Sequence, residues 1–378
     1  MSGQEPHPSG ITVCQETSTA SDIKTVAGEL FNQCGEPDPS LTLVYFAETY
    51  DHEQLCHWLD LLPGPVVGCS SAGQLTPLGF QSTGISGLRL FSAHFQAISY
   101  LIHPLENLVE QVEVIAADVQ DRLHFSKKQA FGMLLVDGLA GREEALSALL
   151  YRALGDVPIV GGSAGDMLRF EKTYVYHKGR LLRNAAVFTL CMTSLPFVVF
   201  KHQHFKATEK RLVITEAEPE MRLVREINGE VAVKAYADLI GVPATALNAS
   251  VFSRYPLMLR IGQDYFVRAI SGVEEDGSLK FFCAIDKGLV LTIGEGQSAV
   301  AALTQTFDEV REEIGEPVII LGCDCILRRL EMEERGIDGD IGRLMAQNRV
   351  FGFNTYGEQY NSLHVNQTFT GVALGGKL

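Results

Sequence analysis

The sequence has no surplus of basic residues, no long apolar run and no secretion signal. Its 31 Lys and Arg residues face 46 Asp and Glu residues, which gives a formal net charge of −15. An acidic chain repels phosphate backbones, so this balance argues against a general binder of nucleic acids or anionic membranes. No apolar stretch reaches the roughly 18 residues of a membrane span, and residues 1–10 lack the segments of a signal peptide. We therefore expect a cytoplasmic protein without a membrane partner.

The eight cysteines show no regular spacing, and a chain of 378 residues does not need a disulfide framework. We expect reduced thiols in a reducing compartment. Cys323 and Cys325 form a close pair, but structural zinc usually needs two pairs with wider spacing, and the sequence has no second pair. These two thiols are therefore expected to fill small volumes at the end of a buried strand.

Apolar residues make up 46% of the chain and charged residues 20%, which is typical of a globular protein with a large core. Short apolar runs alternate with helical patterns in the first half, and strands with hairpin patterns follow. This order predicts a mixed α/β fold in two closely packed domains, each a mixed sheet with flanking helices and antiparallel hairpins. We expect a flexible leader over 1–10, a first domain over 11–215 and a second over 216–378. No linker and no internal repeat is evident.

Two glycine motifs resemble known catalytic or cofactor signatures. Residues 161–165 fit the G-x-S-x-G pattern, in which Ser163 would be the nucleophile of a serine hydrolase, but no helix is expected after the turn. Residues 294–299 resemble a dinucleotide-binding turn, but they follow a hairpin series and lack a ribose-binding acid at the usual distance. Both segments are more simply interpreted as glycine turns.

His202 and His204 are two residues apart in a segment that predicts a strand, so their rings would share one face. Haem iron needs a strong axial ligand in an apolar pocket, and this segment offers imidazoles next to phenylalanines. Arg180 and Arg183 are candidate partners for the haem propionates. The alternative is a pair of histidines on an exposed edge strand.

The C-terminal region is the densest polar segment of the chain. Polar groups on otherwise apolar strands are costly when they are buried without partners, so they must face water, a ligand pocket or each other. A pocket for a small polar ligand and an internal hydrogen-bond network remain equally open. The candidate ligand-binding residues are Asn354, Tyr356, Glu358, His364 and Asn366.

The order of these motifs resembles the FIST family of bacterial sensory proteins, over nearly the whole chain. The first part of the resemblance is carried by GCSSAG at 68–73, VDGLAGREE at 136–144 and GGSAGD at 161–166. The second part is carried by YPLMLRIG at 255–262, GCDCILRRLE at 322–331 and GFNTYGEQ at 352–359. The last two segments are most similar to the stand-alone nitric-oxide-sensing haem proteins of this family (NosP type).

This resemblance implies b-type haem, nitric oxide as its ligand, and control of a partner histidine kinase or a cyclic-di-GMP enzyme. It also implies a histidine as iron ligand, which we assign to His204. The rival positions are His202, His94, His177 and His364. Other members are thought to bind small molecules such as amino acids, which is the alternative function here. Under either function we expect no catalytic centre, and a homodimer is compatible with the sequence.

Overall fold

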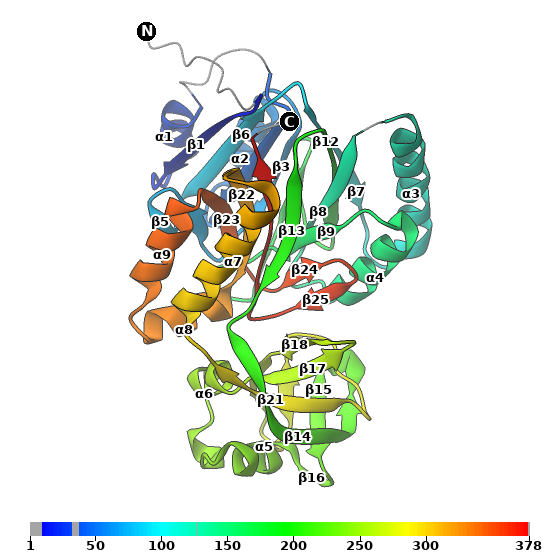
Figure 1. The fold of residues 1–378 in the computed structure, drawn as a ribbon, viewed down its shortest axis with the longest axis vertical. Coiled ribbons are helices and arrows are strands. Elements are labelled where there is room, and N and C mark those ends of the chain that lie inside the picture. The colour runs from blue at the N-terminus through cyan, green and yellow to red at the C-terminus, as the bar shows by residue number, and fades with distance from the viewer. Residues whose placement is uncertain (1–9, 32–37, 127, 377–378) are drawn as a thin grey trace.

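The computed structural model describes residues 10–31, 38–126 and 128–376, which form a body and a lobe (Figure 1). The lobe contains residues 205–296, and the body contains the described residues before and after it. The protein therefore has a mixed α/β fold in two domains, as the sequence predicts. The expected boundary between residues 215 and 216 falls within one strand, and strand pairing groups residues 297–376 with the body. Only Gly10 of the expected leader lies within the described residues.

The body consists of three units that share one order of elements: strand, helix, strand, helix, strand, hairpin, strand. The first unit contains β1 (Thr12–Ser18), α1 (Ile23–Glu29), β2 (Leu41–Phe46), α2 (His52–Asp60), β3 (Val66–Ser70), β4 (Gln74–Thr76), β5 (Gly79–Gln81) and β6 (Ile85–Phe91). The second unit contains β7 (Phe95–Ile102), α3 (Leu108–Phe125), β8 (Gln129–Val136), α4 (Glu143–Leu154), β9 (Ile159–Ser163), β10 (Val175–His177), β11 (Arg180–Leu182) and β12 (Ala186–Thr193).

The third unit follows the same order, with the lobe inserted after its first strand and two helices in place of its second helix. It contains β13 (Phe197–His202), α7 (Ala299–Ile314), β22 (Pro317–Cys325), α8 (Ile326–Glu334), α9 (Asp338–Gln347), β23 (Val350–Thr355), β24 (Glu358–Tyr360), β25 (Leu363–Val365) and β26 (Phe369–Gly375). The expectation that the chain has no internal repeat is therefore wrong.

The three sheets of the body have equivalent strand orders, and each unit donates its hairpin to another unit. The orders are β1-β6-β2-β3, β7-β12-β8-β9 and β13-β26-β22-β23, each extended by a hairpin after the last strand. Hairpin β10–β11 of the second unit extends the first sheet, β24–β25 of the third unit extends the second, and β4–β5 of the first unit extends the third. This cyclic exchange ties the three units into one body.

One glycine marks the equivalent position in each unit. Gly68, Gly161 and Gly352 lie on the third strand and pair in parallel with the second strand. A Cβ atom at these positions would lie 2.2, 2.0 and 1.9 Å from a carbonyl oxygen of that neighbouring strand. Only glycine tolerates such a close approach of two backbones. The repeated glycine therefore has a repeated physical cause.

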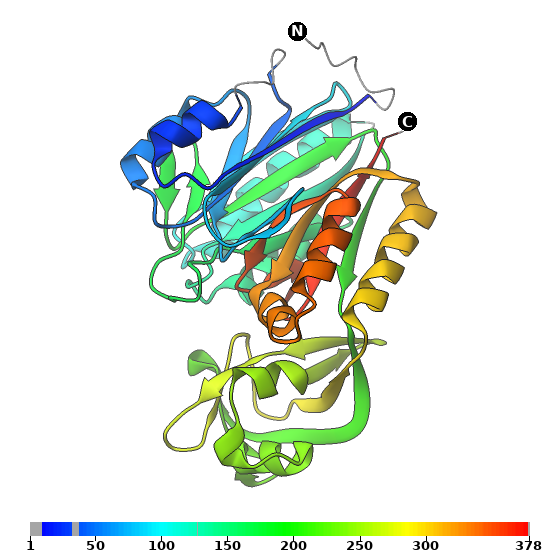
Figure 2. The same ribbon diagram turned by 90° about the vertical axis from the view of Figure 1, so that its left-hand side faces the viewer.

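The three sheets pack their inner faces against a common core, and the helices cover the outer faces (Figures 1 and 2). Leu43, Met133 and Leu321 point into the common core from β2, β8 and β22. Their neighbours Val44 and Leu134 face the helices instead, which is the alternation expected of strands. The largest apolar cluster among the described residues thus lies between the sheets.

The lobe is a single sheet, built around the long strand β14, that is covered by two helices. The order of its strands is β18-β17-β21-β14-β15-β20-β19, with β16 beside β15. The lobe contains β14 (Phe205–Glu218), β15 (Leu223–Ile227), β16 (Glu230–Val231), α5 (Ala232–Ile240), α6 (Ala249–Arg254), β17 (Leu257–Ile261), β18 (Asp264–Arg268), β19 (Ile270–Val273), β20 (Leu279–Phe281) and β21 (Val290–Gly296). The chain enters the lobe through β14 and leaves it through β21 (Figure 1).

Two further expectations are wrong. The helical pattern over residues 330–348 predicts one helix, but this region contains the end of α8 and then α9, with Gly336 between them in the left-handed conformation. Cys14 is disulfide-bonded, so the prediction of eight reduced thiols does not hold there. Cys34 lies outside the described residues, and the other cysteines are free thiols: Cys56, Cys69, Cys191, Cys283, Cys323 and Cys325.

Candidate functional site

Three loops meet where the parallel strand pairs of the body end. They follow β3, β9 and β23, the equivalent strands of the three units. Each loop is hydrogen-bonded to the next, which closes this end of the body. The backbone bonds run from the amide of Gly165 to the carbonyl of Ser70 (3.1 Å), from Ala72 to Asn354 (3.0 Å) and from Tyr356 to Ser163 (3.1 Å).

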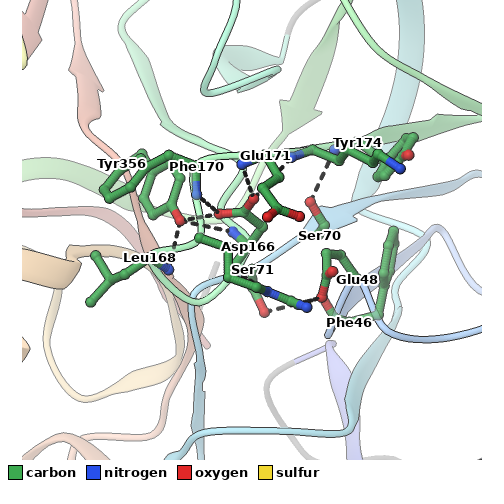
Figure 3. A network of polar contacts seen from close by, with 12 residues as sticks. Phe46, Glu48, Ser70, Ser71, Asp166, Leu168, Phe170, Glu171, Tyr174 and Tyr356 are labelled. Atoms are coloured by element: carbon green, nitrogen blue, oxygen red, sulfur yellow. Dashed lines mark hydrogen bonds and ion pairs between the residues drawn. The ribbon is translucent and has the colours of Figure 1, made fainter.

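Asp166 organises the loop that follows β9 (Figure 3). Its carboxylate accepts hydrogen bonds from the amides of Phe170 (2.9 Å), Glu171 (2.7 Å) and Lys172 (2.9 Å), and from the Tyr356 hydroxyl. Burial opposes ionisation, but the hydrogen bond from Tyr356 and those from the amides outweigh it and hold the pKa of Asp166 below its usual value. Asp166 is therefore ionised and holds the loop through charge-assisted hydrogen bonds.

The same loop contains three residues in the left-handed conformation: Met167 (φ 59°), Leu168 (φ 65°) and Phe170 (φ 53°). This conformation is costly for residues with a Cβ and persists only when surrounding contacts enforce it. The Tyr356 hydroxyl supplies one such contact, because it accepts the amide of Leu168 at 2.7 Å (Figure 3). As a result, Phe170 keeps 45% of its surface exposed and lines a cleft.

This cleft lies between the body and the lobe and has a volume of about 590 Å³. Its body side includes Phe170 and Tyr356, whose rings are stacked with their centroids 4.8 Å apart. Phe282 faces them from the lobe, with its ring centroid 6.1 Å from that of Phe170. Ser271 and Lys280 add polar groups from the lobe. An apolar wall with a few polar groups from two domains is typical of a small-molecule site.

An ion-pair cluster forms the charged wall of the cleft and joins the two domains. Arg222 of the lobe contacts Glu143 at 3.2 Å and Glu144 at 3.0 Å, and both glutamates lie in the first turn of α4 in the body. Burial raises the pKa of Glu143 to about 7, although Arg222 opposes this. Glu144 also accepts the amide of Ala284 at 2.6 Å. We call Arg222, Glu143 and Glu144 the interdomain latch.

The five predicted ligand-binding residues are all buried, and Tyr356 is the one that lines the cleft. Glu358 accepts hydrogen bonds from the hydroxyl (2.6 Å) and amide (3.2 Å) of Thr368 and also bonds the Thr355 hydroxyl. His364 contacts the side chain of Gln359 at 3.3 Å. The side chain of Asn366 has no hydrogen-bond partner among the described residues. The structure thus places Glu358 in an internal hydrogen-bond network.

His204 lies where the chain crosses from the body into the lobe. Its Nε2 is 3.0 Å from Glu331 Oε1, and its Nδ1 is 3.2 Å from Nη1 of Arg328. Arginine can only donate, so Nδ1 accepts and Nε2 carries the proton. Burial lowers the pKa of His204, which keeps the ring neutral. Both nitrogens are therefore engaged, and His204 does not fit the expected iron ligand.

His202 is buried at the end of β13, and its Nδ1 lies 2.9 Å from the hydroxyl of Thr306. That hydroxyl donates to the carbonyl of Ala302, so Nδ1 donates to Thr306 and Nε2 keeps its lone pair. Nε2 has no partner among the described residues. Arg180 and Arg183 are exposed, on and just after strand β11 of another sheet, so no described contact brings them to the histidines.

The two glycine motifs do not have the geometry that a serine hydrolase or a dinucleotide-binding site requires. The Ser163 hydroxyl accepts a hydrogen bond from Gln359 at 2.9 Å, and a loop instead of a helix follows β9. Residues 294–296 belong to β21 and pair with β14. Cys323 and Cys325 are buried, and the described residues contain no cluster of three or more His, Cys, Asp or Glu side chains that could hold a metal ion. None of the described helices is long and apolar enough to span a membrane.

Comparison with known families matches the FIST N domain to residues 40–230 and the FIST C domain to residues 232–361. The chain belongs to the FIST family. FIST domains are sensory modules of signal transduction, so the family match confirms the sensory class that the motifs indicate. The border between the two matched regions lies within the lobe, so each domain of the structure draws on both.

An uncharacterised protein of Methanocaldococcus jannaschii, MJ1623, is also similar to this FIST protein. It is 22% identical, and the match covers 81% of this chain and 67% of the relative. Its name carries no information on ligand or partner.

Apart from Tyr356, sequence reasoning assigned no binding role to the residues that build the cleft. Asp166 was visible only as the end of a glycine motif, and Arg222, Phe170 and Phe282 carry no motif at all. A local signal existed at Asp166, because an acid that follows a glycine turn often caps the backbone amides after it.

Proposed function

We propose that this FIST protein is a sensory module that binds a small polar metabolite, such as an amino acid, in the cleft between body and lobe. The observation that carries the proposal is the cleft of about 590 Å³, to which both domains contribute aromatic and charged side chains. Such sites bury most of a small ligand, and a few fixed polar groups set its orientation. No residue of the cleft forms a nucleophile–base pair, so we propose binding and not catalysis.

The interdomain latch supports a mechanism for signalling. A ligand that contacts Phe170 from the body and Phe282 from the lobe stabilises one arrangement of the two domains over others. Because Arg222 and Glu143 line the same cleft, a bound polar ligand competes with or adds to their ion pair. The change in lobe position is then the signal that a partner protein reads.

This proposal is tested by thermal melting of the protein with the twenty amino acids and with small carboxylates. A ligand at 100 times its Kd raises stability by about 2.7 kcal/mol, which melting detects easily. Replacing Phe170 with Ala removes the exposed stacking surface, and we expect an about tenfold loss of affinity for the ligand found. The matched control is Phe125→Ala, since Phe125 is also exposed but lies at the end of α3, outside the cleft. Equal affinity in both variants contradicts the cleft as the site.

Haem-based sensing of nitric oxide is the second candidate function. The observation that favours it is the buried Nε2 of His202, which has a lone pair and no partner among the described residues. A neutral imidazole in this state is the form that binds iron. His202 would then hold the metal in place of His204, and b-type haem would supply the affinity for the gas.

Addition of hemin to the purified protein, followed by absorption spectroscopy, tests this candidate. Haem binding gives an intense Soret band that shifts with nitric oxide, and His202→Ala abolishes it. His204→Ala serves as the comparison, because both of its nitrogens already have partners. If the protein shows no Soret band after free hemin has been removed, this candidate is excluded and the metabolite proposal stays in place.

For either sensor, the family resemblance supports a partner protein that receives the signal. We propose that a histidine kinase or a cyclic-di-GMP enzyme in the cytoplasm reads the position of the lobe. We expect such an enzyme to co-purify with the wild-type protein, and we expect the ligand to change the amount that co-purifies.

A further inference from the structure

A second cleft lies between the two domains, next to the segments that connect them. It has a volume of about 420 Å³. The lobe contributes Tyr255 and Glu295, and helix α8 of the body contributes Glu331 and Glu334. The amide of Gln297 donates to the carbonyl of His204 at 2.8 Å nearby, where the entering and leaving segments of the lobe lie side by side. We call this site the hinge cleft.

The positive charges of the hinge cleft are already paired. Arg335 contacts Oε1 of Glu331 at 2.8 Å, and Arg254 lies 3.6 Å from Glu334. Glu334 also accepts the hydroxyl of Ser250. Two carboxylate functions are left over, one on each side of the cleft.

The first is Oε2 of Glu331. This side chain is only 5% exposed, and its Oε2 has no hydrogen-bond partner among the described residues. Burial opposes its charge, but hydrogen bonds from His204 and Arg335 hold the pKa of Glu331 below its usual value. A buried, ionised oxygen without a donor is costly, so it is a place where a donor from a ligand gains free energy.

The second is Glu295 on β21 of the lobe. Its side chain is exposed and makes no ion pair or hydrogen bond with any described residue. Tyr255 adds an aromatic ring to the same lining. Carboxylates and an aromatic face are the groups that bind organic cations, by charge-assisted hydrogen bonds and by cation–π attraction.

We propose that the hinge cleft binds an organic ammonium or guanidinium cation that bridges Glu295 of the lobe and Glu331 of the body. The ligand donates to Oε2 of Glu331 and pairs with Glu295 across the cleft. Because these residues belong to different domains, the bound cation ties the lobe to the body at its connection. This site is separate from the cleft of the proposed function and does not depend on it.

Isothermal titration with 1,4-diaminobutane tests the site, since this probe carries two ammonium groups and no anion. We expect saturable binding to the full-length protein that weakens as salt rises, because the contacts are ionic. Glu295→Gln removes one carboxylate without removing any existing contact, and we expect affinity to fall about 10- to 100-fold, as for a charged hydrogen bond. The matched control is Glu275→Gln, an exposed glutamate of the same lobe outside the cleft, which we expect to bind as the wild type does.

Three further arms make the result decisive. 1,4-Butanediol has the same length without charge, and we expect it not to bind. Mg²⁺ at the same concentration should not compete. Glu331→Gln should abolish binding, and circular dichroism shows whether this variant folds. The proposal is overturned if diaminobutane does not bind, if Glu295→Gln binds it as well as Glu275→Gln does, or if butanediol or Mg²⁺ displaces it.

Discussion

Glu358 is protonated in the folded protein at neutral pH, whereas a glutamate in water is ionised at this pH. It is fully buried, and burial raises its pKa to about 8, although the hydrogen bonds from Thr355 and Thr368 act in the opposite direction. The unfolded chain releases this proton near pH 4.5, so the folded state binds more protons between these values. The contribution of Glu358 to the free energy of unfolding is therefore complete below about pH 4.5. It falls as the pH rises towards 8, by at most about 1.4 kcal/mol per pH unit.

Replacing Glu358 with Gln should therefore flatten the dependence of stability on pH. The amide keeps the shape of the protonated acid, accepts from Thr368 and donates to Thr355, and it does not titrate. Urea unfolding at pH 5, 6, 7 and 8 measures the effect. The free energy of unfolding of the variant, relative to that of the wild type, should increase as the pH rises. Glu143 also has a raised pKa, about 7, so part of the slope below pH 7 remains. A slope identical to that of the wild type would mean that Glu358 is ionised in the folded protein.

The elements of the fold follow from local patterns where those patterns are complete. Asp51 is of a residue type that favours the helix N-cap, and its side chain accepts the amide of Gln54 at the start of α2. Ser298 caps α7 in the same way, because its hydroxyl accepts the amide of Ala301. The break between α8 and α9 was missed because the charged residues there continue a helical pattern, while Gly336 takes the left-handed conformation.

The repeat of the three units escaped sequence reading because few of its residues are shared. Two apolar residues and a glycine begin the third strand of each unit, as VVG at 66–68, IVG at 159–161 and VFG at 350–352. Only the glycine is fixed by a steric demand, and the apolar positions need only fill the core. The exchanged hairpins have no local signal, because strand pairing across the molecule depends on packing and not on neighbours in the chain.

At the scale of the whole molecule, the candidate cleft exists only because distant segments meet. Phe170, Arg222 and Phe282 come from a loop of the body and from two parts of the lobe. Sequence patterns report the neighbours along a chain, so they predicted the polar C-terminal strands but not which of their residues reach a cleft. Tyr356 does so because the loop held by Asp166 leaves its ring beside Phe170.

The interdomain latch should control how firmly the lobe is held. Arg222→Gln leaves the buried Glu143 and the partly buried Glu144 without their cation, and breaking a largely buried ion pair costs about 3 kcal/mol. We expect this loss in urea unfolding, together with a larger radius of gyration in X-ray scattering. The lobe should remain partly held, because Arg268 donates to the carbonyl of His364 at 3.1 Å and Gln367 to that of Ser253 at 3.1 Å.

The control for the latch is Arg225→Gln, which removes a half-buried arginine of the same lobe that lies outside the cleft. Arg225 pairs with Glu218 and Asp276, and such solvent-screened ion pairs contribute little to stability. Adding Glu143→Gln to Arg222→Gln should recover much of the lost stability, since the variant then buries one uncompensated carboxylate fewer. If Arg222→Gln costs no more stability than Arg225→Gln and leaves the scattering unchanged, the latch does not hold the lobe, and the proposed signalling mechanism through the latch is contradicted.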